Sequence, residues 1–222
     1  MIYLAILTAL FVALALTLTS LIIGNIAPNK KKMMAELEKM KADLKTWAGD
    51  LTPINRAEME IFSRGQQKHV LRRGVSTTAK GIYTTIFHEP VAAYSYRQFA
   101  GKQKSALMYA KTAEHEYAYI VRKGLTTLYI DGQEVGEINE EGILKGARTG
   151  KELAKVQAEH SSLLPVIVGS REIGSIARKP GSGVKGLNDR AFELLKPDIN
   201  DKEEQLFIAL ALKELVSQVV EK

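Results

Sequence analysis

Residues 203–220, EEQLFIALALKELVSQVV, decide the fold that the sequence predicts. The run from Leu206 to Leu212 is apolar throughout, so it leaves no polar face, and a helix of this kind must be enclosed on all sides. Asp201 as N-cap and Glu204 three residues later match a capping box, and the acidic first turn suits the positive end of the helix dipole. Because a bilayer span needs about 20 apolar residues, we expect protein to enclose this helix.

The sequence before this helix has the pattern of a sheet. Short runs rich in Thr, Tyr, Ile and Val alternate with turn residues, and such short connections favour antiparallel pairing. We therefore predict a mostly antiparallel barrel of about 10 to 12 strands around the C-terminal helix, with Leu206, Phe207, Leu210 and Leu212 in its core. The candidate strands are Val75 to Ala79, Ile82 to Phe87, Ala92 to Phe99, Ala106 to Lys111, Glu116 to Arg122, Thr126 to Ile130, Glu134 to Ile138, Leu153 to Gln157, Leu164 to Val168 and Glu172 to Ala177.

Two segments share one hydrophobic pattern and are predicted to be hairpins. They are residues 128–138, LYIDGQEVGEI, and residues 166–176, VIVGSREIGSI. Asp131-Gly132 suits a type I′ turn and Gly169-Ser170 a type II′ turn, the two turns whose twist matches the flanking strands.

Each hairpin also carries a glycine that indicates a bulge. Val135 and Ile138 are three residues apart, so a regular strand would point them to opposite faces, whereas a bulge at Gly136 turns both inward. Gly174 has the corresponding position in the second hairpin, between Ile173 and Ile176, and indicates a bulge there too. We interpret these glycines as bending the sheet around the helix, in preference to contacting a ligand.

Paired hairpins of the form G-x-E-V-G-x-I, followed by a hydrophobic C-terminal helix, resemble the tubby-like superfamily. The similarity covers residues 70–220. More narrowly, the chain looks like the LURP-one-related and phospholipid-scramblase-like branch of this superfamily. It implies a barrel of about twelve strands around a central C-terminal helix.

This chain departs from that branch in one respect. Scramblases carry a C-terminal membrane segment, whereas the apolar segment here is N-terminal. Lipid translocation and a calcium site are therefore not carried over, and the phosphoinositide-binding residues of tubby proteins have no residue-level match in this sequence.

The N-terminal stretch predicts a transmembrane helix. No charged residue occurs from Ile2 to Ile26, and the length of this stretch is enough for a span. A cleaved signal peptide is the alternative, but it would need a basic residue ahead of a shorter apolar run. Lys30, Lys31 and Lys32 follow, and such a flank is typical of the cytoplasmic side. We expect a single-pass protein with the N-terminus outside and the C-terminal domain in the cytoplasm. The lysines set this topology; the alternative is that they also bind anionic lipid.

A helical stem is predicted to follow, so that three parts result: a transmembrane helix over 1–27, a stem or linker over 28–65 and the barrel domain over 66–222. The stem could be a stalk, or could lie on the membrane or on its own domain; a seam this short favours self-association less. Thr52 and Pro53 indicate the N-cap and first residue of a second helix. The apolar seam of the first helix comprises Met33, Leu37, Met40, Leu44, Trp47 and Leu51.

Composition limits the chemistry further. The 222 residues carry a net charge of +6 and no cysteine. Disulfides and thiolate zinc sites are therefore excluded, and the charge favours anionic partners.

The sequence indicates no catalytic, cofactor-binding or metal-binding residues. Gly181, Gly183 and Gly186 spell G-x-G-x-x-G, but no parallel β-α-β unit surrounds them, so we interpret the segment as a loop. His69, His88, His115 and His160 do not form an i, i+4 zinc pair, and no G-x-S-x-G motif occurs. An unrecognised hydrolase remains a third hypothesis, since triads are defined by geometry.

One basic cluster is a candidate site for anionic lipid. Lys68, His69, Arg72 and Arg73, joined by Lys80, are the densest positive group of the soluble domain, and the group precedes the first predicted strand. A solvated surface run is the simpler interpretation; contact with acidic headgroups is the functional one.

The leading hypothesis is a non-enzymatic, single-span membrane protein. Its cytoplasmic tubby-like domain would bind lipid headgroups or a protein partner at the membrane surface. The alternative is a membrane-tethered scaffold that self-associates weakly through the stem. The expected partners are the bilayer and an anionic phospholipid or a membrane protein; the tether and the lack of a binding motif disfavour nucleic acid.

Overall fold

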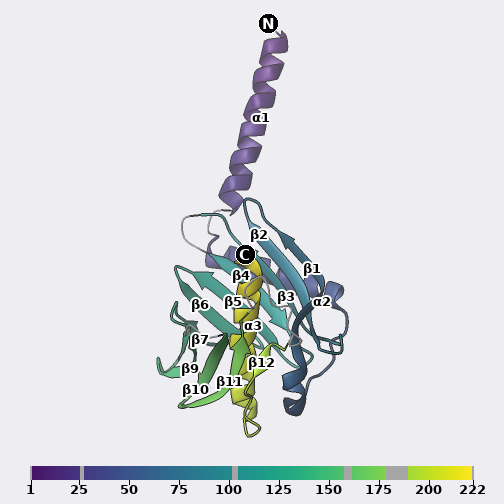
Figure 1. The fold of residues 1–222 in the computed structure, drawn as a ribbon. Coiled ribbons are helices and arrows are strands. Elements are labelled where there is room, and N and C mark those ends of the chain that lie inside the picture. The colour runs from purple at the N-terminus through teal and green to yellow at the C-terminus, as the bar shows by residue number, and fades with distance from the viewer. Residues whose placement is uncertain (1, 26–27, 102–104, 158–161, 179–189, 222) are drawn as a thin grey trace.

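The computed structural model describes residues 2–25, 28–101, 105–157, 162–178 and 190–221 (Figure 1). Its helices are α1 (Ile2–Asn25), α2 (Lys30–Ala48), the short 3-10 helix η1 (Arg56–Ile61) and α3 (Asp201–Val220). α1 extends away from the rest of the molecule as a single helix (Figure 1). Within the residues described, no helix has both the length and the apolar character required to cross a membrane.

The described residues form twelve strands in one antiparallel sheet, and each strand pairs with the next along the chain. The sheet curls into a nearly closed barrel, because Ser63 bridges Arg190 and the Ala191 N–H donates to the Phe62 carbonyl at 2.8 Å. The strands are β1 (Phe62–Arg72), β2 (Thr77–Thr85), β3 (Pro90–Gln98), β4 (Ala106–Lys111), β5 (Glu116–Arg122), β6 (Leu125–Ile130), β7 (Gln133–Ile138), β8 (Ile143–Gly146), β9 (Glu152–Val156), β10 (Leu163–Val168), β11 (Arg171–Ala177) and β12 (Phe192–Glu193).

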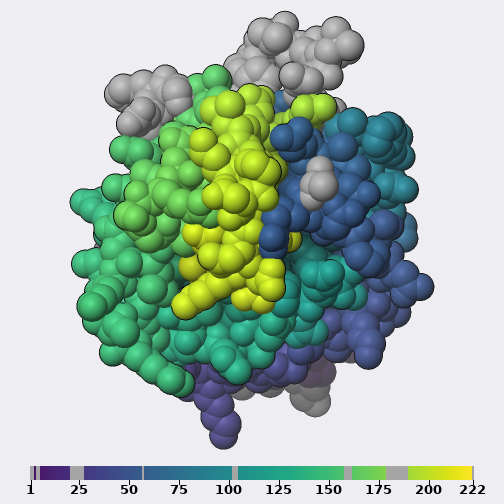
Figure 2. Space-filling model, turned by 90° about the horizontal axis from the view of Figure 1, so that it is seen from below, coloured from purple at the N-terminus to yellow at the C-terminus, as the bar shows by residue number. Residues whose placement is uncertain are grey.

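α3 lies inside the barrel, as its all-round apolar sequence predicts. Leu206 to Leu212 are buried, and the Tyr119 hydroxyl donates to the Ala209 carbonyl at 2.7 Å. From below, α3 (yellow) is seen between the late strands (green) and the first segments of the domain (blue) (Figure 2). The N-cap prediction was wrong by one residue: Asn200, not Asp201, caps the helix and forms the capping box with Glu203.

α2 packs on the outer face of the same sheet. Its buried residues Met33, Leu37, Met40 and Leu44 lie against outward side chains of β2 to β5 such as Leu107. The seam is therefore covered by the chain's own domain, in agreement with the predicted alternative in which the stem lies on that domain. Because α3 covers the inner face and α2 the outer face, β3 and β4 are buried on both sides.

The predicted hairpins are present with their bulges. Asp131 and Gly132 both have positive φ, of 49° and 78°, as a type I′ turn requires, and Gly169 has a φ of 62°. The pairing slips by one residue beside Gly136 in β7 and beside Gly174 in β11. A Cβ at Gly174 would lie 3.1 Å from Phe207 Cε2, so this glycine lets the sheet approach α3 closely.

The start of the domain differs from the prediction. Thr52 and Pro53 begin no helix; the turn is the 3-10 helix η1, which Asn55 caps together with Glu58. β1 then begins at Phe62, ahead of the predicted boundary at residue 66, and the two strands predicted between Val75 and Phe87 are the single strand β2.

Candidate functional site

A groove of about 410 Å³ runs between α2 and the outer face of β1, β2 and β3. It exists because the apolar seam of α2 rests on β3 and β4, which leaves an open strip beside the helix over β1 and β2. Its cationic side chains come from four elements. They are Lys39 from α2, Arg72 from β1, Lys80 from β2 and Arg97 from β3, and we call this site the basic groove.

Strand register gathers the three cations of the sheet. Arg72 pairs with Thr78, and Thr78 pairs with Arg97, so the two arginines flank one threonine across three strands. Lys80 is two residues beyond Thr78 and therefore points to the same face. The outer face of these strands thus carries a compact basic surface.

Carboxylates on α2 neutralise part of this charge. Asp43 forms a salt bridge with Lys80, and Glu36 forms one with Arg97. Lys39 and Arg72 are exposed and make no ion pair with any described residue. Four cations and two carboxylates line the groove, which leaves two positive charges unmatched.

Trp47, the single tryptophan of the chain, lines the same groove. The Lys80 ammonium lies 5.9 Å from the centroid of its ring, within the range of a cation–π contact. A ligand that draws Lys80 away from the ring would change the surroundings of this indole.

The structure divides the predicted lipid patch. Arg72 and Lys80 line the basic groove, whereas Lys68 and Arg73 are exposed outside it. The predicted patch was also placed ahead of the first strand, but Lys68 and Arg72 lie within β1. Lys30, Lys31 and Lys32 form the exposed first turn of α2, which Asn29 caps.

Lys39 and Arg97 were not predicted from the sequence as site residues. The signal for Arg97 is alternation in β3, which places it on the same face as Ala93 and Ser95. Lys39 is three residues after Glu36 and four before Asp43, so all three share one flank of α2.

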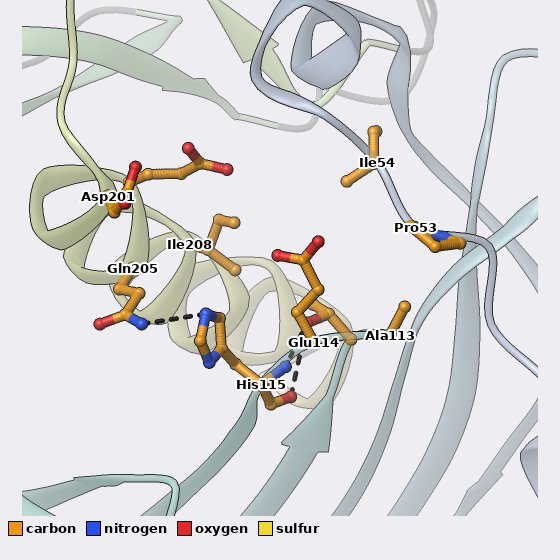
Figure 3. Close-up of a pocket in the computed structure, with 10 residues that line it drawn as sticks. Pro53, Ile54, Ala113, Glu114, His115, Asp201, Gln205 and Ile208 are labelled. Atoms are coloured by element: carbon orange, nitrogen blue, oxygen red, sulfur yellow. Dashed lines mark hydrogen bonds between the residues drawn. The ribbon is translucent and has the colours of Figure 1, made fainter.

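A second pocket, of about 260 Å³, lies at the start of α3 (Figure 3). His115 Nδ1 lies 2.8 Å from an Asp131 carboxylate oxygen, and His115 Nε2 lies 2.9 Å from the Gln205 amide nitrogen. This pattern assigns the proton to Nδ1 and makes Nε2 the acceptor. Both ring nitrogens are therefore engaged in bonds that tie the β4–β5 turn to the β6–β7 turn and to α3, and neither is left to act as a general base.

The residues considered for metal and phosphate binding lie partly outside the described part of the chain. Among the described residues, no three His, Asp or Glu side chains are grouped so that they could hold a metal ion. Gly181, Gly183 and Gly186, and also His160, lie outside the described residues.

Comparison with known proteins finds no family model, no curated protein and no solved structure that matches this chain.

Proposed function

We propose that this protein is a membrane-anchored binding protein, not an enzyme, whose barrel binds anionic lipid headgroups in the basic groove. The observation that carries the proposal is the pair of unmatched cations, Lys39 and Arg72, on opposite walls of a 410 Å³ groove. Phosphate and carboxylate groups are the natural counterions of such a pair, and an exposed arginine can bind either group with two hydrogen bonds.

The sequence of α1 supports the membrane anchor. A span needs about 20 apolar residues; the described residues of α1 alone do not meet this requirement, so the proposal rests on the full sequence from Ile2 to Ile26. Its described side chains are exposed, including Leu10 and Phe11 at 64% and 68%, and the stretch to Ile26 carries no charge in sequence. Exposed apolar surface of this extent needs a cover, and we propose that lipid provides it.

The first turn of α2 supports an anionic surface. Lys30, Lys31 and Lys32 stand at the positive end of the helix dipole, where cations are unfavourable. Anionic headgroups beside them would offset this cost, and cytoplasmic leaflets supply such headgroups. We therefore place the N-terminus outside and the barrel in the cytoplasm.

Reversing these charges is expected to change the orientation. Replacing Lys30, Lys31 and Lys32 by Glu, with three lysines added before Ile2, should move the C-terminus to the other side in a large fraction of molecules. Accessibility of a C-terminal tag to protease in sealed vesicles measures this. A tag that is outside the cytoplasm in the unmodified protein would contradict the orientation.

Binding of anionic headgroups is expected to change the fluorescence of Trp47. The full chain, held in maltoside micelles, is titrated with short-chain phosphatidylserine and, separately, with short-chain phosphatidylethanolamine. Each basic residue near an anionic surface contributes about 1 kcal/mol. Arg72→Glu removes one positive charge and adds one negative charge, about 2 kcal/mol in all, so it should weaken the phosphatidylserine response by about thirtyfold.

Arg73→Glu is the matched control, because it makes the same change in net charge one residue outside the groove. It should bind within about twofold of the unmodified chain. Equal loss in both variants would mean that net charge, not the groove, attracts the lipid. No response to either lipid would leave a protein partner at the membrane surface as the occupant.

The tubby-like resemblance belongs to this proposal. A nearly closed antiparallel barrel around a C-terminal helix is the architecture that the resemblance implies, and this agreement supports it. A hydrolase is the weaker candidate, because both nitrogens of His115 are already engaged.

A further inference from the structure

Two connections of the barrel share one sequence pattern. Residues 71–76, LRRGVS, lead from β1 into β2, and residues 121–126, VRKGLT, lead from β5 into β6; we call them the basic turns. Each has an aliphatic residue, two basic residues, a glycine, a second aliphatic residue and a hydroxyl residue, in that order. Turn chemistry explains the glycine but requires no aliphatic residue after it. The repeated combination of charge and apolar side chain therefore indicates a common role.

The second aliphatic residue of each basic turn is exposed to solvent. Val75 is 66% exposed and Leu125 is 44% exposed. The basic residues beside them are exposed too, and none of them makes an ion pair or a side-chain hydrogen bond with a described residue. They are Arg72, Arg73, Arg122 and Lys123. Each basic turn thus presents an apolar side chain with two uncompensated positive charges next to it.

Both basic turns lie at one end of the barrel. Each strand is antiparallel to the next, so the turns that follow β1 and β5 are at one end, and those that follow β2, β4, β6 and β10 are at the other. Arg171, directly after the β10–β11 turn, donates to Glu203 at 2.8 Å, so α3 begins at that other end and terminates at the end of the basic turns. Figure 1 shows α1 extending away from the end where α3 terminates. A membrane that holds α1 therefore faces the basic turns.

The turns at the opposite end of the same strands have the opposite charge. The turns that join β2 to β3, β4 to β5 and β6 to β7 contain no Lys or Arg, and their acidic residues are Glu89, Glu114 and Asp131. Phe87, in the first of these turns, is 67% exposed. Apolar side chains are therefore exposed at both ends, but only Val75 and Leu125 have basic neighbours. An anionic surface would attract the end with the basic turns and repel the other.

Two carboxylates also lie at the end of the basic turns. Glu140 and Glu141 follow β7, and a Cβ at Gly124 would lie 2.3 Å from Glu140 Oε1, so this side chain packs against the second basic turn. Neither carboxylate forms an ion pair with a described basic residue. The charges of the basic turns are therefore still available to a partner.

We infer that the barrel docks end-on to an anionic bilayer, with Val75 and Leu125 inserted among the lipid headgroups. The aliphatic side chains gain free energy on leaving water, and the long stems of the neighbouring Arg and Lys residues let their charged ends stay among the phosphates. The inference rests on the proposed membrane anchor, because α1 sets which end faces the bilayer. It goes beyond the basic groove, since the groove takes one headgroup whereas the basic turns need a continuous surface. Short-chain lipid in micelles therefore does not report on the basic turns.

The chain has no cysteine, so a single introduced cysteine carries a fluorophore at one chosen position. Val75→Cys, Leu125→Cys and Phe87→Cys are labelled separately, and each full chain is reconstituted into vesicles of phosphatidylcholine and phosphatidylserine with quencher-labelled acyl chains. The dyes at 75 and 125 should be quenched at least about threefold more strongly than the dye at 87, because insertion places them at the boundary of headgroups and acyl chains. In vesicles of phosphatidylcholine alone, this quenching should fall at least about threefold, because the basic residues lose their counterions.

A second variant tests whether the two basic turns act together. Val75→Asp should weaken the quenching of a dye at residue 125 at least about threefold, because it removes one inserted side chain and adds a negative charge. Phe87→Asp, the same kind of change in an exposed turn at the opposite end, is the matched control and should leave the quenching unchanged. Unchanged emission from Trp47, which packs against the outer face of the sheet, shows that each variant is folded.

Alkaline carbonate extraction separates this inference from the membrane anchor. A chain that resists extraction but shows equal quenching at 75, 125 and 87 would overturn the docking and leave the anchor in place. A chain that carbonate extracts would overturn the anchor, and with it the orientation on which the docking rests. Equal loss of quenching in Val75→Asp and Phe87→Asp would also overturn the inference.

Discussion

Replacing Phe207 by alanine is expected to lower the free energy of unfolding by about 3 to 5 kcal/mol. Phe207 is fully buried on α3, its ring lies 5.0 Å from that of Phe192, and the strand at Gly174 closes over it. Truncation leaves a cavity that the surrounding sheet cannot fill. Urea unfolding in micelles, followed by circular dichroism, measures the loss.

Lys202→Ala, an exposed position in the first turn of α3, is the control and should change stability by less than about 0.5 kcal/mol. Deleting residues 203–222 should prevent folding, because the inner face of the sheet would be exposed to water. A folded barrel without this helix, or a loss below about 1 kcal/mol in Phe207→Ala, would contradict the position of α3.

Replacing Leu44 by aspartate is expected to cost about 4 kcal/mol or more, because it removes a buried side chain and places an unpaired charge against the sheet. Leu44 is fully buried between α2 and the outer face. The same change at Ala42, on the exposed side of the helix, should cost under about 1 kcal/mol. Unfolding of both proteins in urea gives the difference.

A Leu44→Asp protein with unchanged stability but altered crosslinking between copies would contradict the packing of α2. That result would favour the alternative hypothesis of a free stem that self-associates.

The parts of the fold that could be predicted have strong local signals. Leu206 to Leu212 leave no polar face, so only an enclosed helix suits them. Asp131-Gly132 and Gly169-Ser170 each have turn chemistry that fixes a hairpin.

β1 was missed because its sequence lacks that signal. Residues 63–69 are polar and include Gly65, and the register slips twice, between Phe62 and Gln66 and between Gln67 and Val70. Each slip breaks the two-residue alternation by which a strand is recognised.

The partner of α2 could not be determined from its heptad seam, because the same spacing suits another helix, a membrane surface or a sheet. The complementary signal lies in the strands. Residues 91–94 and 106–110 are buried throughout, which is typical of strands covered on both faces.

The basic groove could not be predicted from the sequence for a related reason. Lys39, Arg72 and Arg97 are far apart along the chain, and only the pairing of β1, β2 and β3 beside α2 brings them together. Charge density along the sequence instead selected Lys68 and Arg73, which the structure places outside the groove.

Photo-crosslinking from Val70 tests the lipid-binding proposal most directly. Val70 lines the basic groove and is 41% exposed, so a photoreactive residue there reaches a bound headgroup without disturbing the core. In native membranes it should label acidic phospholipids above their share of the bilayer, whereas the same residue at Leu194, 65% exposed and outside the groove, should not. Equal labelling from both positions, or labelling of zwitterionic lipid alone, would contradict the proposal.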